Sequence, residues 1–172
     1  MKQKGFTLIE LLVVISIIGV LSSVVLVSLN SARAKARDAK RLADKNQMIL
    51  ALNLYYDEKG EWPTSASGGT QPSCLAPSSE SCWQGTYTGL DSLVSSMSPY
   101  MSSFPKNNAD SGTYAYDRYW YFSKAAAGDV AVGGPAGAYF IWIQEKTLTT
   151  SDCPIRLENF DKYYYCFEYL GP

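Results

Sequence analysis

The residue with the clearest chemical demand in this sequence is Glu10, the single charge in an apolar run from Phe6 to Leu29. An acidic residue at mid-membrane costs about 2.5–3.5 kcal/mol on insertion scales, so such residues are suspected of a function. A plain membrane anchor gives no reason to keep a carboxylate one turn inside its apolar segment. We therefore expect Glu10 to have a functional role.

Catalytic chemistry has little support in the composition. The chain contains no histidine, which removes the commonest general base and the commonest metal ligand. Ser-Lys or carboxylate chemistry is still possible in principle, but no motif supports it. The net charge of -1 and the pI near 5.4 argue against a dedicated nucleic-acid binder. We expect a protein that is not an enzyme.

The four cysteines are the other reactive side chains, and all lie in the second half of the sequence or close before it, at Cys74, Cys82, Cys153 and Cys166. Their spacing suggests two local disulfides, Cys74–Cys82 and Cys153–Cys166, out of three possible connectivities. A zinc site is disfavoured because there is no C-x-x-C and no histidine. Free thiols in the cytosol are the other alternative. Disulfides would place the body of the protein outside the cytoplasm.

The length of the apolar run from 6 to 29 limits the kind of segment that it can form. It exceeds the roughly 20 residues of a bilayer-spanning helix. The core of a secretory signal has about 7–15 apolar residues, although Ala-Arg-Ala at 32–34 imitates a cleavage site. A buried core helix of this length would show a polar face. The run predicts a membrane-spanning helix.

The sequence at the start of the apolar run forms a specific motif. Lys2-Gln3-Lys4-Gly5 is a short basic leader that ends in glycine, and Phe6-Thr7-Leu8-Ile9-Glu10 follows. It closely resembles the prepilin signal of type IV pilins and type II secretion pseudopilins. The resemblance implies cleavage between Gly5 and Phe6 by a membrane aspartyl peptidase, prepilin peptidase, and N-methylation of Phe6. A glycine suits that position because it lets the extended backbone enter a protease cleft.

The same resemblance implies a role for Glu10 in assembly. After cleavage, the amine of Phe6 is a positive charge beside an apolar segment, and Glu10 of one subunit can neutralise it in a neighbour. Both charges are then tolerated when subunits stack. The alternative is that Glu10 merely lies close enough to the membrane interface to reach water.

Helix formers continue past the membrane segment without a proline, which predicts one helix from Phe6 to about Lys59 that ends at Gly60. Its second half shows a larger apolar stripe that a body could cover, formed by Leu42, Ile49, Leu52 and Tyr56. A seam of small residues accompanies it, formed by Ala32, Ala36, Ala39 and Ala43. The seam suits either a core face or packing against neighbouring subunits.

A basic run also lies in this half and comprises Arg33, Lys35, Arg37, Lys40 and Arg41. It outweighs Lys2 and Lys4, so flanking charge alone would place the body in the cytoplasm. The prepilin-like signal and the cysteines favour the opposite topology. The run itself is interpreted as a solvated helix face or a contact with lipid headgroups.

Beyond the helix, residues 64–112 predict a long connection with a short helix at about Leu90–Met101. Strands are predicted at Thr113–Ser123, Gly137–Glu145 and Tyr163–Tyr169. The expected fold is α+β and type IV pilin-like: a long N-terminal helix packed on an antiparallel sheet of three to four strands. A C-terminal cysteine loop resembles that of true pilins. Major pseudopilins often bind calcium nearby, where Asp152, Glu158 and Asp161 could serve, but they lack calcium-loop spacing and solvated loop acids are favoured.

The predicted organisation is a leader at 1–5, a transmembrane and filament-core helix at 6–29, an amphipathic second half at 30–60, a variable loop with a short helix at 61–112, and a sheet with a cysteine loop at 113–172. The resemblance implies a filament subunit anchored in the inner membrane, with prepilin peptidase, an assembly platform, membrane lipid and other copies of itself as partners. The favoured function is a type IV pilin for adhesion, motility or DNA uptake. The alternative is a pseudopilin that drives protein secretion. No cofactor other than calcium is considered, and nucleic acid is an unlikely partner.

Overall fold

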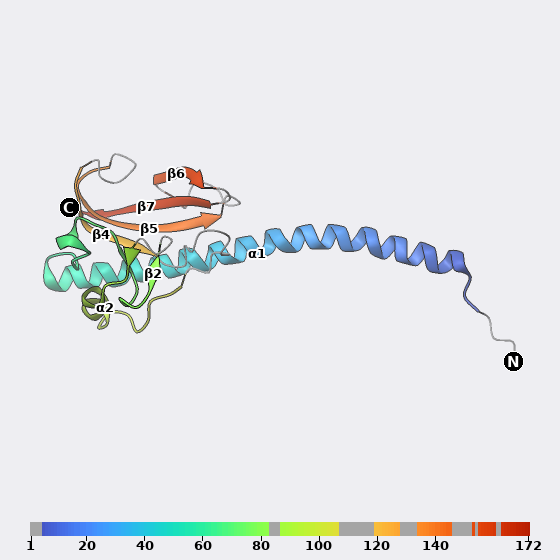
Figure 1. Cartoon of the computed structure of the whole chain (residues 1–172), viewed down its shortest axis with the longest axis horizontal. Coiled ribbons are helices and arrows are strands. Elements are labelled where there is room, and N and C mark those ends of the chain that lie inside the picture. The colour runs from blue at the N-terminus through green and yellow to red at the C-terminus, as the bar shows by residue number, and fades with distance from the viewer. Residues whose placement is uncertain are drawn as a thin grey trace.

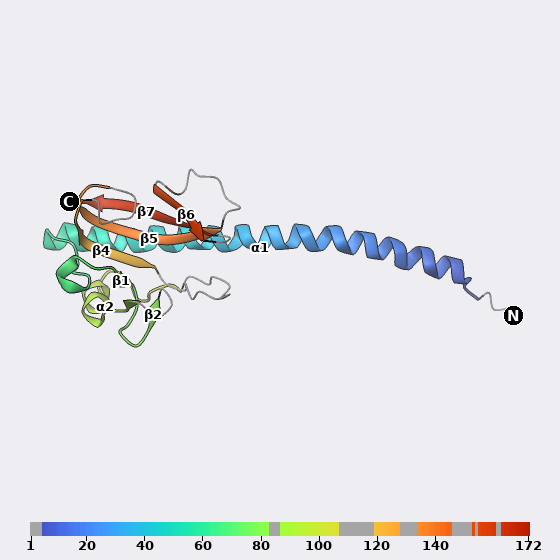
Figure 2. The same ribbon diagram turned by 45° about the horizontal axis from the view of Figure 1, so that its top comes forward.

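In the computed structural model of the chain, the described residues are 5–82, 87–106, 119–127, 134–145, 153, 155–160 and 163–172, with backbone alone at 81–82, 87–88, 145, 155–160 and 163. A long helix, α1 (Leu8–Lys59), runs from one end of the molecule to the other. Its second half packs against a body of strands and a short helix, and its first half projects from that body as a stalk (Figures 1 and 2).

Local chemistry explains both ends of α1. Thr7 is the N-cap, with φ -82° and ψ 152°, and its hydroxyl accepts a hydrogen bond from the backbone N–H of Glu10. Gly60 is the C-cap in the left-handed conformation, with φ 73°, and its N–H donates to the carbonyl of Tyr56 over 2.8 Å. Glycine adopts this conformation without a steric penalty. The predicted helix and its glycine stop are confirmed, and its 52 residues give a rod of about 78 Å.

The body comprises the 3-10 turn η1 (Ser67–Gly69), helix α2 (Asp91–Met97) and seven strands. The strands are β1 (Ser73–Cys74), β2 (Ser81–Cys82), β3 (Tyr87–Thr88), β4 (Trp120–Ala125), β5 (Gly137–Glu145), β6 (Ile155–Phe160) and β7 (Tyr163–Gly171). An antiparallel sheet has the order β1-β4-β5-β7-β6, and β2 pairs with β3 separately. Four longer strands therefore lie on the helix, as expected for the predicted α+β fold, and the two-residue β1 adds a fifth at the edge.

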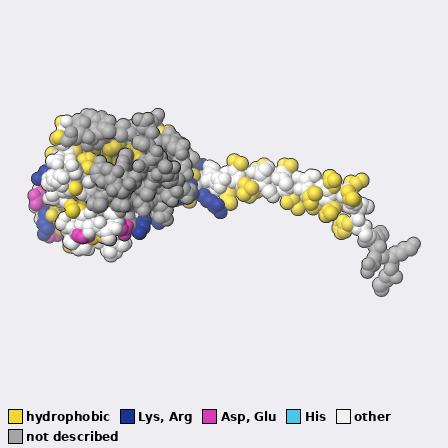
Figure 3. Space-filling view, in the orientation of Figure 1, with side chains coloured by type: hydrophobic (Ala, Val, Ile, Leu, Met, Phe, Trp, Pro, Cys, Tyr) yellow, Lys and Arg dark blue, Asp and Glu magenta, His cyan; other side chains and the backbone are white. Residues whose placement is uncertain are grey.

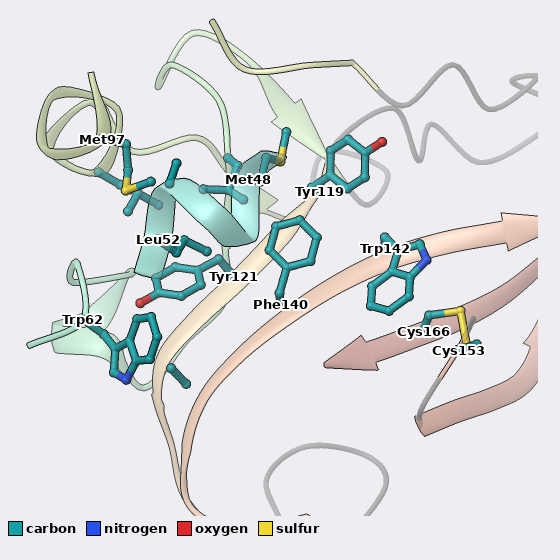
Figure 4. Packing of buried hydrophobic residues seen from close by; sticks show 14 residues of the cluster. Met48, Leu52, Trp62, Met97, Tyr119, Tyr121, Phe140, Trp142, Cys153 and Cys166 are labelled. Atoms are coloured by element: carbon teal, nitrogen blue, oxygen red, sulfur yellow. A yellow bond between two sulfur atoms is a disulfide. The ribbon is translucent and has the colours of Figure 1, made fainter. Parts of the chain in front are cut away.

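The core lies where the concave face of the sheet meets the second half of α1 (Figure 4). Met48 and Leu52 of α1 are fully buried against Tyr121 of β4 and Phe140 and Trp142 of β5. Burial of one such side chain contributes about 1.5–3 kcal/mol. The apolar stripe of the sequence is the face that the body covers, because Leu52 is buried and Leu42, Ile49 and Tyr56 are half-buried.

The end of the chain is tied to the end of α1. The indole N–H of Trp62, just after the helix, donates to the carbonyl of Pro172 over 3.2 Å. The same ring packs on Tyr56 with 4.5 Å between ring centroids. Gly171 of β7 lies against this indole, so strand β7 is held beside the last turn of the helix.

Three local expectations differ from the structure or extend beyond it. The helix expected at Leu90–Met101 is shorter, because α2 ends at Met97. Of the strand expected at Thr113–Ser123, the described part begins at Tyr119 and forms β4 from Trp120 to Ala125. The strand β6 was not expected, and it exists by pairing with β7 rather than by its own composition.

Candidate assembly site on the exposed helix

The predicted cleavage site lies just outside the helix. Gly5 and Phe6 have no regular secondary structure, and Phe6 is 90% exposed. The helix starts two residues after Phe6, at Leu8. The bond between Gly5 and Phe6 is therefore accessible and not engaged in helical hydrogen bonding.

Glu10 is held by a capping box with Thr7. Its Oε2 accepts hydrogen bonds from the backbone N–H of Thr7 over 2.7 Å and from the Thr7 hydroxyl over 2.7 Å. The Thr7 hydroxyl in turn accepts from the N–H of Glu10 over 3.2 Å. Such a box satisfies two amide donors that a helix start leaves open. The sequence interpretation missed Thr7, although Thr-x-x-Glu ahead of an apolar run is a readable capping signal.

The first half of α1 is apolar and uncovered. Every residue from Leu8 to Leu29 is exposed, and the most apolar stretch of 18 residues contains no buried residue. By length and composition this helix can cross a membrane. Figure 3 shows the apolar side chains along the stalk. Lipid or other protein must cover such a surface, because water does not tolerate it.

The seam of small residues continues this uncovered surface beside the body. Ala32, Ala36, Ala39 and Ala43 are all exposed, so the interpretation of the seam as a core face is wrong. Two large apolar side chains extend the same surface, Leu50 at 59% and Leu54 at 44% exposed. A hollow of about 340 Å³ lies between these leucines and residues 100–103. The seam is available to a neighbouring molecule.

The five residues of the basic run differ in burial, and Arg37 is half-buried. Arg41 is buried, and its guanidinium pairs with the buried carboxylate of Asp38 over 2.5 Å, so its interpretation as part of a solvated face is wrong. The sheet covers the helix face that carries this arginine. Arg33, Lys35 and Lys40 are exposed, and Figure 3 shows basic side chains where the stalk leaves the body.

Polar contacts continue along the buried face of α1. The Tyr119 hydroxyl lies 3.3 Å from the carboxylate of Asp44 and 3.4 Å from the carbonyl of Arg41. Burial raises the pKa of Tyr119 far above its usual range, and the charge of Asp44 adds to this shift. Tyr119 therefore stays protonated and donates. These contacts fix the position of the sheet along the helix.

The structure describes some of the cysteines and candidate calcium ligands, but not all of them. Cys153 and Cys166 form a disulfide, as their spacing suggested, and it joins the segment before β6 to strand β7. Cys74 is also disulfide-bonded, and the side chain of Cys82, its predicted partner, lies outside the described residues. Asp152, Asp161 and the side chain of Glu158 lie outside them too, so calcium binding stays a prediction. Among the described residues no group of three or more potential ligands could hold a metal ion.

Comparisons with known proteins agree with this N-terminal site. Residues 1–26 match the model of the prokaryotic N-terminal methylation motif. The chain is 39% identical over 79 residues to the type II secretion system core protein G of Klebsiella pneumoniae, a match that covers 46% of this chain and 56% of that protein. It is 43% identical over 76 residues to the type IV major pilin protein PilE1 of Neisseria gonorrhoeae, covering 41% and 45%. A fimbrial protein of Neisseria meningitidis is 42% identical over 80 residues, covering 45% and 44%.

These matches are partial. The chain spans about half the length of the curated relatives it matches. No solved structure matches it. The prepilin-type N-terminus predicted from Gly5, Phe6 and Glu10 is nevertheless confirmed as a motif.

Proposed function

We propose that this chain, a member of the family of type IV pilins and type II secretion pseudopilins, is a structural subunit that polymerises into a filament. It is made as a precursor, cut by prepilin peptidase between Gly5 and Phe6, and N-methylated on Phe6. Before assembly, residues 6–29 anchor it in the cytoplasmic membrane with the body outside the cytoplasm. An assembly platform in that membrane then adds it to the filament. The proposal assigns the chain no catalytic step.

The observation that carries this proposal is the uncovered apolar half of α1. Its first turn contains Glu10, which forms a capping box with Thr7. Each large apolar side chain that leaves lipid for water costs about 1.5–3 kcal/mol, so the stalk cannot leave the bilayer alone. Other copies of the same stalk are a surface of matching chemistry. A filament whose interior is made of these stalks removes the whole apolar surface from water.

The flanking charge and the disulfide favour opposite topologies in the membrane. The exposed Arg33, Lys35 and Lys40 would by charge count lie on the cytoplasmic side. The disulfide Cys153–Cys166 belongs to an oxidising compartment instead. We place the body outside the cytoplasm, because a prepilin-type signal and a disulfide agree on it.

Glu10 changes partner in this scheme. In the isolated chain its carboxylate accepts hydrogen bonds from the backbone N–H and the hydroxyl of Thr7, and the helix start favours its negative charge. In the filament it faces the Phe6 amine of a neighbour, a full positive charge in an apolar surrounding. The exchange favours assembly because the amine then gains a partner that the monomer cannot supply.

The test compares two substitutions at Glu10. Glu10→Ala removes the charge and its bonds to Thr7, whereas Glu10→Gln keeps a side chain that suits a capping box but carries no charge. If charge neutralisation drives assembly, both variants are cleaved normally and both lose filaments. Normal filament yield from Glu10→Gln would show that capping is the role of the side chain, and normal yield from both would remove the proposed assembly step.

The location of the filament in the cell distinguishes the two candidate functions. A type IV pilin is displayed at the surface, and the C-terminal cysteine loop resembles that of pilins. A pseudopilin filament stays in the periplasm and serves protein secretion, and the matches to core protein G of Klebsiella pneumoniae and Escherichia coli support this equally. Recovery of the chain in sheared surface fibres identifies the pilin. Its absence from them, together with loss of secretion on deletion, identifies the pseudopilin.

A further inference from the structure

The start of α1 lies close to the bond that the proposed processing cuts. Thr7 is the N-cap in an extended conformation, and the first helical residue is Leu8. The carbonyl of Thr7 accepts the first hydrogen bond of the helix, from the N–H of Leu11 over 3.3 Å. Gly5 and Phe6 precede this turn without regular structure, and in Figures 1 and 2 the chain leaves the helix axis there. The position of the N-cap therefore decides whether the scissile bond lies inside the helix.

The side chain of Thr7 holds the N-cap in place. Its hydroxyl accepts a hydrogen bond from the backbone N–H of Glu10 over 3.2 Å, one of the donors that a helix start leaves open. Because this donor is a backbone group, the bond remains when the Glu10 side chain is replaced. Both variants at Glu10 that test the assembly proposal therefore keep this cap. A role of Thr7 in processing can thus be measured apart from the role of Glu10 in assembly.

Without the Thr7 hydroxyl, a different residue becomes the best available cap. Glycine is among the residues preferred at the N-cap, whereas valine and alanine are poor there. The nearest residue upstream that suits the position is Gly5, because the side chain of Phe6 has no hydrogen-bonding group. A cap at Gly5 would start the helix at Phe6, and the carbonyl of Gly5 would accept the first helical hydrogen bond. That carbonyl belongs to the scissile bond.

We propose that Thr7 is a positioning residue for cleavage of the precursor, because its hydroxyl keeps the scissile bond out of the helix. The inference rests on the proposed function and deepens its processing step. Hydrolysis adds water across the Gly5–Phe6 amide: the carbonyl carbon of Gly5 receives the hydroxyl group, the bond to the nitrogen of Phe6 breaks, and that nitrogen leaves with the proton as an amine. A peptidase must first bind this backbone in an extended form. Carbonyl and amide groups that are paired inside a helix have no free partner for its cleft.

The rate of precursor cleavage in cells that make prepilin peptidase tests this inference. The full chain is pulse-labelled and followed by gel shift, and mass spectrometry identifies the new N-terminus. Thr7→Val keeps the shape of the side chain without the hydroxyl and should be cleaved about fivefold more slowly than wild type, the usual effect of one N-cap on a helix equilibrium. Thr7→Ser keeps a capping hydroxyl and should be cleaved at the wild-type rate. Ser16→Ala, which removes a hydroxyl bonded to the Leu12 carbonyl in the same helix, is the matched control and should not change the rate.

A proline in place of Leu8 separates capping from direct recognition of the hydroxyl by the peptidase. Proline fits the first turn of a helix and disfavours the helical conformation in the residue before it. Thr7→Val combined with Leu8→Pro should therefore start its helix at position 8 without any hydroxyl and be cleaved near the wild-type rate. Leu8→Pro alone is the control and should also be cleaved normally. A double variant that stays slow beside a normal control would show that the peptidase reads the hydroxyl itself, and would overturn the inference.

The helix start can also be measured without the peptidase. Backbone carbon-13 chemical shifts of the detergent-solubilised precursor should place Gly5 and Phe6 outside the helix in wild type and in Thr7→Ser. In Thr7→Val the same residues should move toward helical values. An unchanged helix start in Thr7→Val would overturn the inference, whatever the cleavage rates are.

These outcomes separate the inference from its premise. If wild type is cleaved between Gly5 and Phe6 and Thr7→Val is cleaved as fast, the inference is wrong and the proposed processing stands. If wild type is not cleaved at that bond, the proposed processing is wrong and the inference fails with it.

Discussion

Lys45 of α1 and Glu168 of β7 form an ion pair across 2.8 Å, although 123 residues separate them in the sequence. The Lys45 ammonium also lies 4.9 Å from the ring centroid of Trp142 on β5. Both groups are largely removed from solvent. One lysine thus joins the helix to two neighbouring strands, and it sits between the polar contacts of Asp38, Arg41 and Asp44 and the apolar core around Met48.

Loss of the Lys45 ammonium should weaken the attachment of the sheet to the helix. Lys45→Met keeps most of the side-chain length and should lower the free energy of unfolding by about 1–2 kcal/mol, the sum of a half-buried ion pair and a cation–π contact. Thermal unfolding of the detergent-solubilised full chain measures it. Lys35→Met, the same change at an exposed site, should stay within about 0.5 kcal/mol of wild type. Equal effects of the two variants would refute a special role of Lys45.

Arg41→Ala should be more damaging than any exposed member of the basic run. It removes one partner of the buried Asp38–Arg41 pair, which typically costs about 3–5 kcal/mol. Denaturant unfolding of the full chain in detergent provides the measurement. Arg33→Ala is the control on the same helix, and its stability should remain near wild type because Arg33 is exposed. If the two variants unfold alike, the pair is not structurally important.

Features of the chain that depend on neighbouring residues were predictable. The helix and its end at Gly60 follow from the absence of proline and from the need of glycine at a left-handed cap. The disulfide Cys153–Cys166 follows from short spacing. The capping box is equally local, because Thr7 and Glu10 stand at the spacing that the motif requires, although the prediction for Glu10 rested on its charge alone.

Features that depend on distant residues were not predictable. Arg41 looked like its exposed neighbours, because its burial depends on which helix face the sheet covers. Contacts from Tyr119 and Glu168 decide that, and each lies far along the chain from its partner on α1. Strand β6 was missed for the same reason, since its hydrogen bonds to β7 define it. The burial of charges on a helix cannot be derived from helical periodicity alone.

Removal of the Cys153–Cys166 disulfide should destabilise the body. The bond links positions with a sequence separation of 13 next to the central strand pair, and loss of such a cross-link typically costs about 2–3 kcal/mol. The double variant Cys153→Ser with Cys166→Ser should therefore unfold at a lower temperature than wild type under oxidising conditions. With reductant present, the difference between the two proteins should disappear. A difference that persists in reductant would mean that the serines, not the lost bond, cause the effect.

Gly137 should not tolerate a side chain. Its φ is 145°, and a Cβ there would lie 2.2 Å from the carbonyl oxygen of Gly171, which pairs with the start of β5. Gly137→Ala should lower the free energy of unfolding by at least about 2 kcal/mol through backbone strain and this clash. Gly19→Ala on the stalk is the matched control, because a Cβ there meets no atom within 4 Å. Unchanged stability of Gly137→Ala would contradict the tight contact between β5 and β7.

Asp91 should make the attachment of α2 sensitive to acid. Its carboxylate accepts a hydrogen bond from the Ser78 hydroxyl and another from the backbone N–H of Ser78 over 2.8 Å. These bonds hold the pKa of Asp91 below the ordinary value of 3.8, and the bond from the hydroxyl contributes most. Because the pKa is depressed in the folded chain, the stabilisation is complete above 3.8 and is lost as the pH falls through the folded value. Asp91→Asn should therefore unfold at a lower temperature than wild type at about pH 6, and the unfolding temperatures of the two proteins should converge at about pH 2.

Ser78→Ala removes the hydroxyl donor and keeps the N–H. Its unfolding temperature should differ less from that of wild type, with the same dependence on pH. A difference between Asp91→Asn and wild type that is the same at both pH values would show that the charged carboxylate is not what holds the start of α2.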